Sequence, residues 1–296
     1  MESMVMQNTP TQFPVFVKQQ NLFTPSMLFY QGSQRQKNKA RIATEYERFY
    51  GLSVSKIRKY VIPARLEEYD KKHHFGSGDK KKKKDDIART MYGVFRFTDD
   101  FVKTNRVIIK THVIYTKYPN EGEHISLPPF LINDVKYTPW EESDLCDFVT
   151  NYEFLFLVFE NNVDREKERK NKNTFLSCIF YVKMKKGHIV EIRKVYERTK
   201  KIIWEGIKQW PVMNKDGSIR MCPVNTERPV MANNLPKAEE SYICHVRPHA
   251  DPLNPEKLEN GEFINRQSFW LNRNFIRDLV EENRVHGLFE GCEYGT

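Results

Sequence analysis

Long hydrophobic runs are scarce in this chain of 296 residues, and their scarcity excludes several classes of protein. The longest strictly apolar run, FLFLVF at 154–159, is far shorter than the ~20 apolar residues that a membrane-spanning helix needs. The first residues also lack the charged start and apolar stretch of a secretory signal. We therefore expect a cytoplasmic protein that does not use a membrane as a partner.

Cysteine is also rare, and its spacing argues against a disulfide framework. The chain has five cysteines, an odd number, with no short repeated spacing between them. Cys178 stands inside an apolar, strand-like run, where a cysteine most simply serves as a small core residue. The sequence thus predicts free thiols in a reducing compartment.

The charge balance is basic. There are 48 Lys and Arg against 39 Asp and Glu, which gives a formal net charge of +9. Such a bias favours anionic partners, with nucleic acid first, although many proteins without such partners are mildly basic. With 39% hydrophobic and 13% aromatic residues, the chain can bury a substantial core.

The N-terminal third divides into two zones. Residues 1–40 are rich in Gln, Ser, Pro and Asn without sustained periodicity, so we expect a flexible extension. Residues 41–95 look helical, because apolar residues from Ile42 to Ile57 recur every three or four positions. The lysine run Lys80–Lys84 is predicted to be a solvated loop, and Asp85 and Asp86 suit the start of the following helix.

From about residue 100 the pattern becomes α+β. Apolar or β-branched runs at 106–115, 152–160 and 174–184 predict strands of one sheet, the last two buried on both faces. Residues 188–208 form an amphipathic helical pattern, and 266–283 predict a short strand followed by a helix. We therefore predict a single domain over 41–296, with a mixed β-sheet flanked by helices and an N-terminal helical segment.

The stretch CHVRPHA at 244–250 concentrates reactive side chains. Cys244, His245 and His249 are metal-ligand types, but Pro248 opposes a helix there, and no second Cys/His cluster completes a tetrahedral set. Adjacent residues on a strand point to opposite faces, which weakens a Cys–His nucleophile pair as well. An arginine between two histidines is better suited to phosphates or base edges, because its planar fork matches those acceptors.

Several stretches together carry a family resemblance. ICHVRPHA and the later RQSFWLNRNFI resemble the closing part of the MutH/Sau-type family of GATC-specific restriction endonucleases. The motifs DIARTMYG, RVIIKTHVIYTK, INDVKYTPWEES, FLFLVFE and RKVYERTKKIIWEGI precede them in the family's order, so the resemblance covers roughly 45–285. It implies a restriction-endonuclease-like fold, and it is strongest for the family's C-terminal, DNA-binding effector domain.

The family's cutting motif is incomplete here. Cleaving members hold Mg²⁺ with an Asp and a Glu-x-Lys, since a hard cation takes clustered oxygen ligands. In RVIIK the lysine is kept as Lys110, but Ile108 occupies the glutamate position, and the aspartate position falls near Phe101 with Asp99 and Asp100 only in the neighbourhood. Because isoleucine cannot ligate a metal, we expect no catalytic residues, no metal and no cofactor.

An alternative set of residues keeps active cleavage open. Asp134 and Lys136 could mimic an Asp-x-Lys pair, with Glu121 or Glu123 as the second carboxylate, in a Mg²⁺-dependent nuclease that hydrolyses phosphodiester bonds. The proline-flanked context of Asp134 predicts a loop rather than a rigid strand, which makes this the weaker reading.

The sequence therefore predicts a module that binds double-stranded DNA at GATC-type sites and leaves cutting to a separate catalytic domain or subunit. A basic interaction protein without DNA specificity is the third hypothesis. Lys80–Lys84 and the loop 163–174 are expected to position the phosphate backbone. The candidate DNA contacts are Lys110, His245, Arg247, His249, Arg266, Gln267, Asn272 and Arg273.

Overall fold

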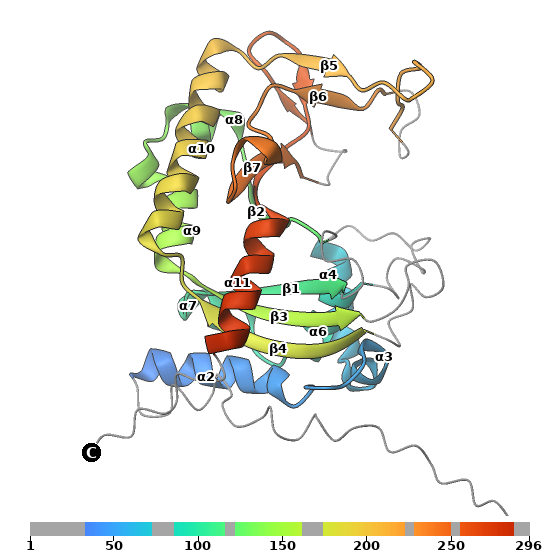
Figure 1. Ribbon diagram of the computed structural model, residues 1–296, viewed down its shortest axis with the longest axis vertical. Coiled ribbons are helices and arrows are strands. Elements are labelled where there is room, and N and C mark those ends of the chain that lie inside the picture. Colours follow the sequence, from blue (N-terminus) through green and yellow to red (C-terminus); the bar gives the residue numbers. More distant parts are fainter. Residues whose placement is uncertain are drawn as a thin grey trace, which may run out of the picture.

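A computed structural model describes residues 33–72, 86–115, 122–161, 174–222, 228–249 and 255–286. Over these ranges the chain is α+β, with two three-stranded sheets and two small two-stranded ones (Figure 1). Within the described part, no helix is both long and apolar enough to cross a bilayer. Several predictions fall outside these ranges, namely those on residues 1–32, Lys80–Lys84, Asp85, Glu121 and nearly all of the 163–174 loop.

The first sheet confirms the three strands expected from the apolar runs. Its order is β1 (Val107–Tyr115), β3 (Glu153–Asn161) and β4 (Thr174–Val182). β1 runs parallel to β3, and β4 is antiparallel to it, so the sheet is mixed as predicted. Phe154 to Phe159 are fully buried, which explains why this strand shows no alternation of polar and apolar residues. The burial on both faces predicted for 174–184 is wrong for β4, because it is the last strand of the sheet and leaves Phe175 36% exposed.

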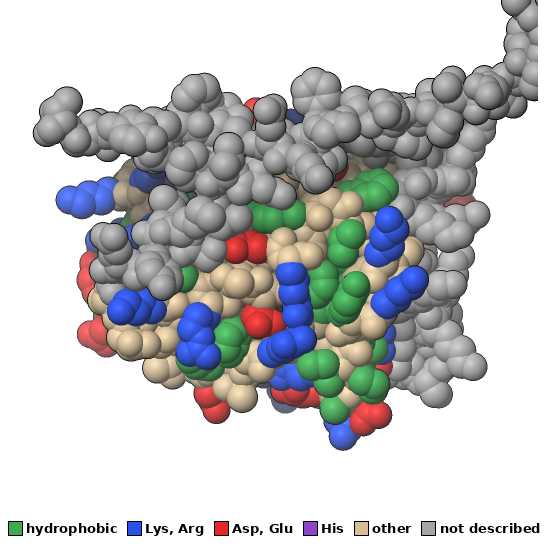
Figure 2. All heavy atoms as spheres, turned by 90° about the horizontal axis from the view of Figure 1, so that it is seen from below, with side chains coloured by type: hydrophobic (Ala, Val, Ile, Leu, Met, Phe, Trp, Pro, Cys, Tyr) green, Lys and Arg blue, Asp and Glu red, His purple; other side chains and the backbone are tan. Residues whose placement is uncertain are grey.

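N-terminal helices cover one face of this sheet. In Figure 1, α2 (Gln34–Glu47) lies beneath the first sheet. α3 (Val54–Ile57) and α6 (Ile87–Val94) also pack against this sheet. Their apolar side chains pack against Leu155 and Leu157 in one core cluster. Figure 2 views the molecule from this side, and the described basic side chains there are scattered among hydrophobic and acidic ones.

Two boundaries in this region differ from the prediction. The flexible extension was expected to cover residues 1–40, but α2 already begins at Gln34, capped by Ser33. The helical pattern over 41–61 is also interrupted, because Gly51 turns the chain with φ of 70°. The predicted cap of the later helix is confirmed, since the Asp86 side chain accepts a hydrogen bond from the Arg89 amide at 2.9 Å.

The second sheet has the order β2 (Ile125–Phe130), β10 (Gln267–Leu271) and β7 (Cys244–Pro248), all antiparallel. One of its faces shares a second core cluster with the first sheet, α9 (Asp144–Asn151), α10 (Lys186–Glu205) and α11 (Arg273–His286). The CHVRPHA stretch thus lies mostly in the edge strand β7, and it is not helical, as Pro248 predicted.

The remaining elements are short. α4 (Pro63–Lys72) packs against α6, α7 (Asp99–Thr104) precedes β1, and α8 (Ile132–Tyr137) packs against α10. Asp134 therefore lies on a helix, contrary to its predicted loop, because the flanking prolines stand outside the six helical residues. The small sheets are β5 (Gln209–Pro211) with β6 (Met231–Asn233), and β8 (Glu256–Lys257) with β9 (Phe263–Ile264). Within the described ranges, 3₁₀ turns cover Arg58–Tyr60, Trp140–Glu142 and Ala238–Glu240.

Candidate nucleic-acid interface

The two faces of β7 have different chemistry. Cys244 and Val246 point into the core, whereas His245 and Arg247 lie on the opposite face, as the period of two in a strand requires. Burial raises the pKa of the Cys244 thiol to about 12, so it stays protonated at neutral pH. A protonated, buried thiol is a poor nucleophile, and Cys244 packs in the core cluster between the sheets.

The outer face of the second sheet gathers the polar side chains of CHVRPHA around one tryptophan. The Arg247 guanidinium lies over the Trp270 ring, 4.7 Å from its centroid, and the Trp270 indole N–H donates to the Arg247 carbonyl at 3.3 Å. His249 Nδ1 lies 3.0 Å from the Ser268 hydroxyl. We call this surface the His/Arg face; it consists of His124, His245, Arg247, His249, Ser268 and Trp270.

Two histidines support this face from below. The rings of His124 and His245 meet edge to face with centroids 4.6 Å apart, and His245 Nδ1 lies 2.5 Å from the Asn272 side-chain oxygen. The Asn272 amide group donates in turn to the carbonyls of Ala238 and Ser241. His245 and Asn272 are both buried, so they hold the face in shape rather than reach outward.

The charge of the face at neutral pH comes from arginine. Burial, opposed by the Asn272 hydrogen bond, lowers the pKa of His245 to about 4. Burial, with Arg247 and Arg273 nearby, lowers the pKa of His124 as well. Both rings are therefore neutral near pH 7, and the exposed Arg247 carries the positive charge.

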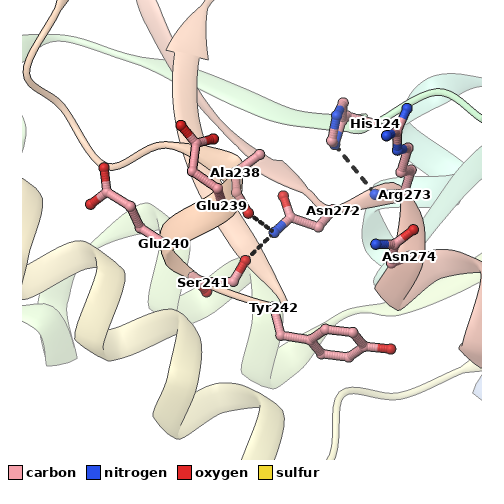
Figure 3. Close-up of a pocket in the computed structure, with 9 residues that line it drawn as sticks. All are labelled: His124, Ala238, Glu239, Glu240, Ser241, Tyr242, Asn272, Arg273 and Asn274. Carbon is pink, nitrogen blue, oxygen red and sulfur yellow. Dashed lines mark hydrogen bonds between the residues drawn. The ribbon is translucent and has the colours of Figure 1, made fainter.

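A cavity of about 540 Å³ opens beside His124 at the start of α11 (Figure 3). His124 accepts a hydrogen bond from the Arg273 amide at 3.3 Å. Glu239 and Glu240 line the same cavity from the 3₁₀ turn, so its walls carry both signs of charge. Figure 3 shows the Asn272 amide between that turn and α11, where it joins the two.

Lys110 links two strands of the protein instead of facing a partner. Its ammonium is buried and donates to the Ser126 carbonyl at 2.6 Å, which ties β1 to β2. Burial lowers the pKa of Lys110 to about 8. Ile108 lies two residues earlier on the same face of β1 and packs against the core cluster between the sheets. Both residues are thus half-buried, Lys110 with its ammonium bound to β2 and Ile108 packed against the core cluster.

The predicted contact residues separate into two groups. Gln267 is 1% exposed, and its amide donates to the Asn265 carbonyl at 2.6 Å. His245 and Asn272 are buried as well, and Lys110 is half-buried with its ammonium bound to Ser126; these four form the interior group. The other group is at the surface, with Arg247, Arg266 and Arg273 exposed and His249 half-buried. The backbone amide of His249 donates to the Arg266 carbonyl at 2.8 Å, which brings these two predicted residues together.

The alternative catalytic set is dispersed in the described structure. Lys136 is buried, forms an ion pair with Glu259, and places its ammonium 4.6 Å from the centroid of the Trp204 ring. Asp134 and Glu123 are exposed. Across the described ranges, no three His, Cys, Asp or Glu side chains gather in a group that could hold a metal.

His124, Ser268 and Trp270 are the three residues of this face that are not among the candidate contacts predicted from the sequence. Trp270 stood inside the quoted RQSFWLNRNFI, but Phe269, Trp270 and Leu271 form a continuous apolar run that does not show which side chain faces outward. His124 had no comparable signal, because it reaches His245 only through the pairing of β2, β10 and β7.

No family model matches this chain. It is 23% identical over 215 residues to the type II restriction enzyme Sau3AI of Staphylococcus aureus, a match that covers 64% of this chain and 40% of that enzyme. The matched region thus spans only about two fifths of the enzyme's length. This similarity supports a distant relationship to restriction endonucleases.

Proposed function

We propose that this chain binds double-stranded DNA sequence-specifically, at GATC-type sites, as a regulatory module of restriction-endonuclease-like fold that does not cleave by itself. The observation that carries the proposal is the stacking of the exposed Arg247 guanidinium on Trp270, on an edge strand of the second sheet. The similarity to a restriction enzyme supports DNA as the partner.

The geometry of Arg247 suits the reading of a base. Arginine bonds guanine O6 and N7 through two parallel N–H groups, a contact that tolerates little rotation of the guanidinium. The Trp270 ring restrains that rotation, and its indole N–H fixes the Arg247 backbone. Arg266 and Arg273 are exposed nearby in the chain and are proposed to contact phosphates, which position the duplex without reading its sequence.

The interior position of Lys110 supports the absence of cleavage. Its ammonium is bound to the Ser126 carbonyl, and Ile108 supplies no oxygen where the family's motif has a glutamate. Cleavage at the same site would then require a separate catalytic domain or subunit. In such an enzyme, DNA bound to this chain would favour a cutting-competent state of the catalytic part.

A gel-shift and cleavage assay tests this proposal. The protein is titrated with a GATC duplex and with a duplex whose four central bases are scrambled, with and without Mg²⁺. Tighter binding of the GATC duplex, with no strand cleavage, is the expected result. Equal affinities would instead indicate a basic protein without sequence specificity. Mg²⁺-dependent cutting that is lost in Asp134→Ala or Lys136→Ala would establish the nuclease alternative.

A further inference from the structure

A basic β-arm projects from the body of the molecule beside the His/Arg face. The arm comprises residues 208–222 and 228–237, and contains β5 and β6, which lie at the end of the molecule away from the first sheet (Figure 1). Most of the described residues between 209 and 231 are exposed, and none of them is buried. A segment with so little core of its own needs another reason to hold a defined shape.

Backbone hydrogen bonds give the arm that shape. Val212 N–H donates to the Val230 carbonyl, Arg220 N–H to the Val212 carbonyl, and Val230 N–H to the Arg220 carbonyl, each at 2.8 Å. Three extended segments of the chain, around Val212, Arg220 and Val230, are therefore joined by backbone hydrogen bonds. Gly217, with φ of 82°, lies in the turn between the segments around Val212 and Arg220.

The surface of the arm is both basic and apolar. Between 208 and 237 the sequence has five basic residues and two acidic ones, Asp216 and Glu227. The Asp216 carboxylate is occupied within its turn, where it accepts from the Ser218 amide at 2.9 Å and hydroxyl at 2.6 Å. The basic residues alternate with apolar side chains that are each more than a third exposed, namely Trp210, Met213, Ile219, Met221 and Met231.

We propose that this arm is a second DNA-binding element, which enters a groove of the duplex flanking the site read by the His/Arg face. The inference rests on the proposed function. A ribbon of antiparallel strands fits the major groove, and apolar side chains such as Met and Ile can also wedge between base steps in the minor groove. The positive charge favours DNA over a protein surface without an acidic patch.

The arm is attached to the body of the protein next to the His/Arg face. The Pro236 carbonyl accepts a hydrogen bond from Val246 N–H at 2.8 Å, so the base of the arm continues the edge of β7 immediately beside Arg247. At ~3.3 Å per residue, the six residues from Gln209 to Asn214 reach roughly 17–20 Å. Half a turn of B-DNA is about 17 Å along the axis, so the tip reaches the next groove.

Duplexes that differ only in their flanks test the inference. One carries about 3 base pairs on each side of a central GATC, and the other about 15, enough for more than a helical turn. We expect the wild-type protein to bind the longer duplex at least about tenfold more tightly, and to protect about 5 additional base pairs on the arm's side from hydroxyl radicals.

The triple variant K215A/R220A/R228A removes three exposed charges of the arm. It should bind the short duplex as the wild type does, lose the gain from the long flanks, and have a salt slope lower by up to about 2.7, or 0.9 for each phosphate contact. The matched control R193A/K194A/K201A removes the same charge from exposed sites on α10 and should retain the flank effect.

Each other outcome overturns the inference in a distinguishable way. If the wild type prefers GATC but gains nothing from the flanks, or if the control loses as much as the arm variant, the arm is not a groove element although the proposed function stands. If the free protein is a dimer that M213S/I219S dissociates, the arm is a protein interface. If no duplex binds, both the arm's role and the proposed function fail.

Discussion

The two three-stranded sheets of this protein bury their residues differently. The first sheet, β1-β3-β4, is packed between the N-terminal helices and the second core cluster, and its central strand is sealed on both faces. The second sheet, β2-β10-β7, buries one face and turns the other, with Arg247 and Trp270, outward. A sheet covered on both sides serves as a scaffold, whereas a half-covered sheet can present side chains to a partner.

Truncation of a buried side chain should lower the free energy of unfolding more in the first sheet than in the second. Phe156→Ala removes a ring that is 0% exposed and stacks on Phe180 at 5.5 Å, so we expect a loss of about 3–5 kcal/mol in the free energy of unfolding. Phe175→Ala, on β4 of the same sheet but 36% exposed, is the matched control and should cost much less. Equal losses in denaturant titrations would contradict the two-sided burial of this sheet.

The buried ammonium of Lys110 makes stability depend on alkaline pH. Its folded pKa of about 8 lies below its unfolded value of 10.5, so the unfolded chain binds more protons between these values and stability rises with pH there. The full contribution is about 3 kcal/mol as an upper limit. In Lys110→Met this rise should disappear from denaturant titrations at pH 8 and pH 10; an unchanged rise would mean that Lys110 is solvated.

Arg247 tests the open face of the second sheet. Arg247→Ala should weaken binding to the GATC duplex by about 1–3 kcal/mol and relax the preference over the scrambled duplex, because a bidentate base contact is lost. Uniform weakening on both duplexes with a shallower salt slope would instead assign Arg247 to a phosphate. Lys201→Ala, on the exposed side of α10, provides a control with the same change in charge.

His245 gives the smallest effect at neutral pH. Its folded pKa of about 4 lies below the unfolded 6.5, so its contribution to stability is present above pH 6.5 and is lost as the pH falls towards 4. His245→Gln should therefore lower the acid sensitivity of thermal unfolding between pH 6.5 and pH 5, relative to wild type. An unchanged acid profile would show that the ring is not held neutral in the folded protein.

Much of the fold could be predicted, because the relevant signals are local. The near-continuous apolar runs of β3 and β4 and the amphipathic pattern of α10 appear within single stretches of sequence. The cap at Asp86 is equally local. The break at Gly51 was missed because the apolar spacing continues through it, although the chain there changes direction.

The candidate site was only partly predictable. CHVRPHA and RQSFWLN were both quoted from the sequence as stretches that carry candidate contacts, without a prediction that they pair. The structure pairs them directly, with Ser268 opposite Arg247 in the register of β10 and β7. The burial of Gln267 and Asn272 could not be read from the sequence, since it depends on which face of the strand and which end of the helix meet the core. The approach of His124 depends on the same pairing.

The sequence by itself determined the α+β composition and the main strands and helices, because each is a property of nearby residues. Only the tertiary structure decided which basic residues are exposed. Lys110 and Arg247 are equally charged in the sequence, yet strand pairing buries the first against Ser126 and exposes the second on Trp270. The reason is that the exposure of a side chain depends on what covers it, and that covering comes from distant parts of the chain.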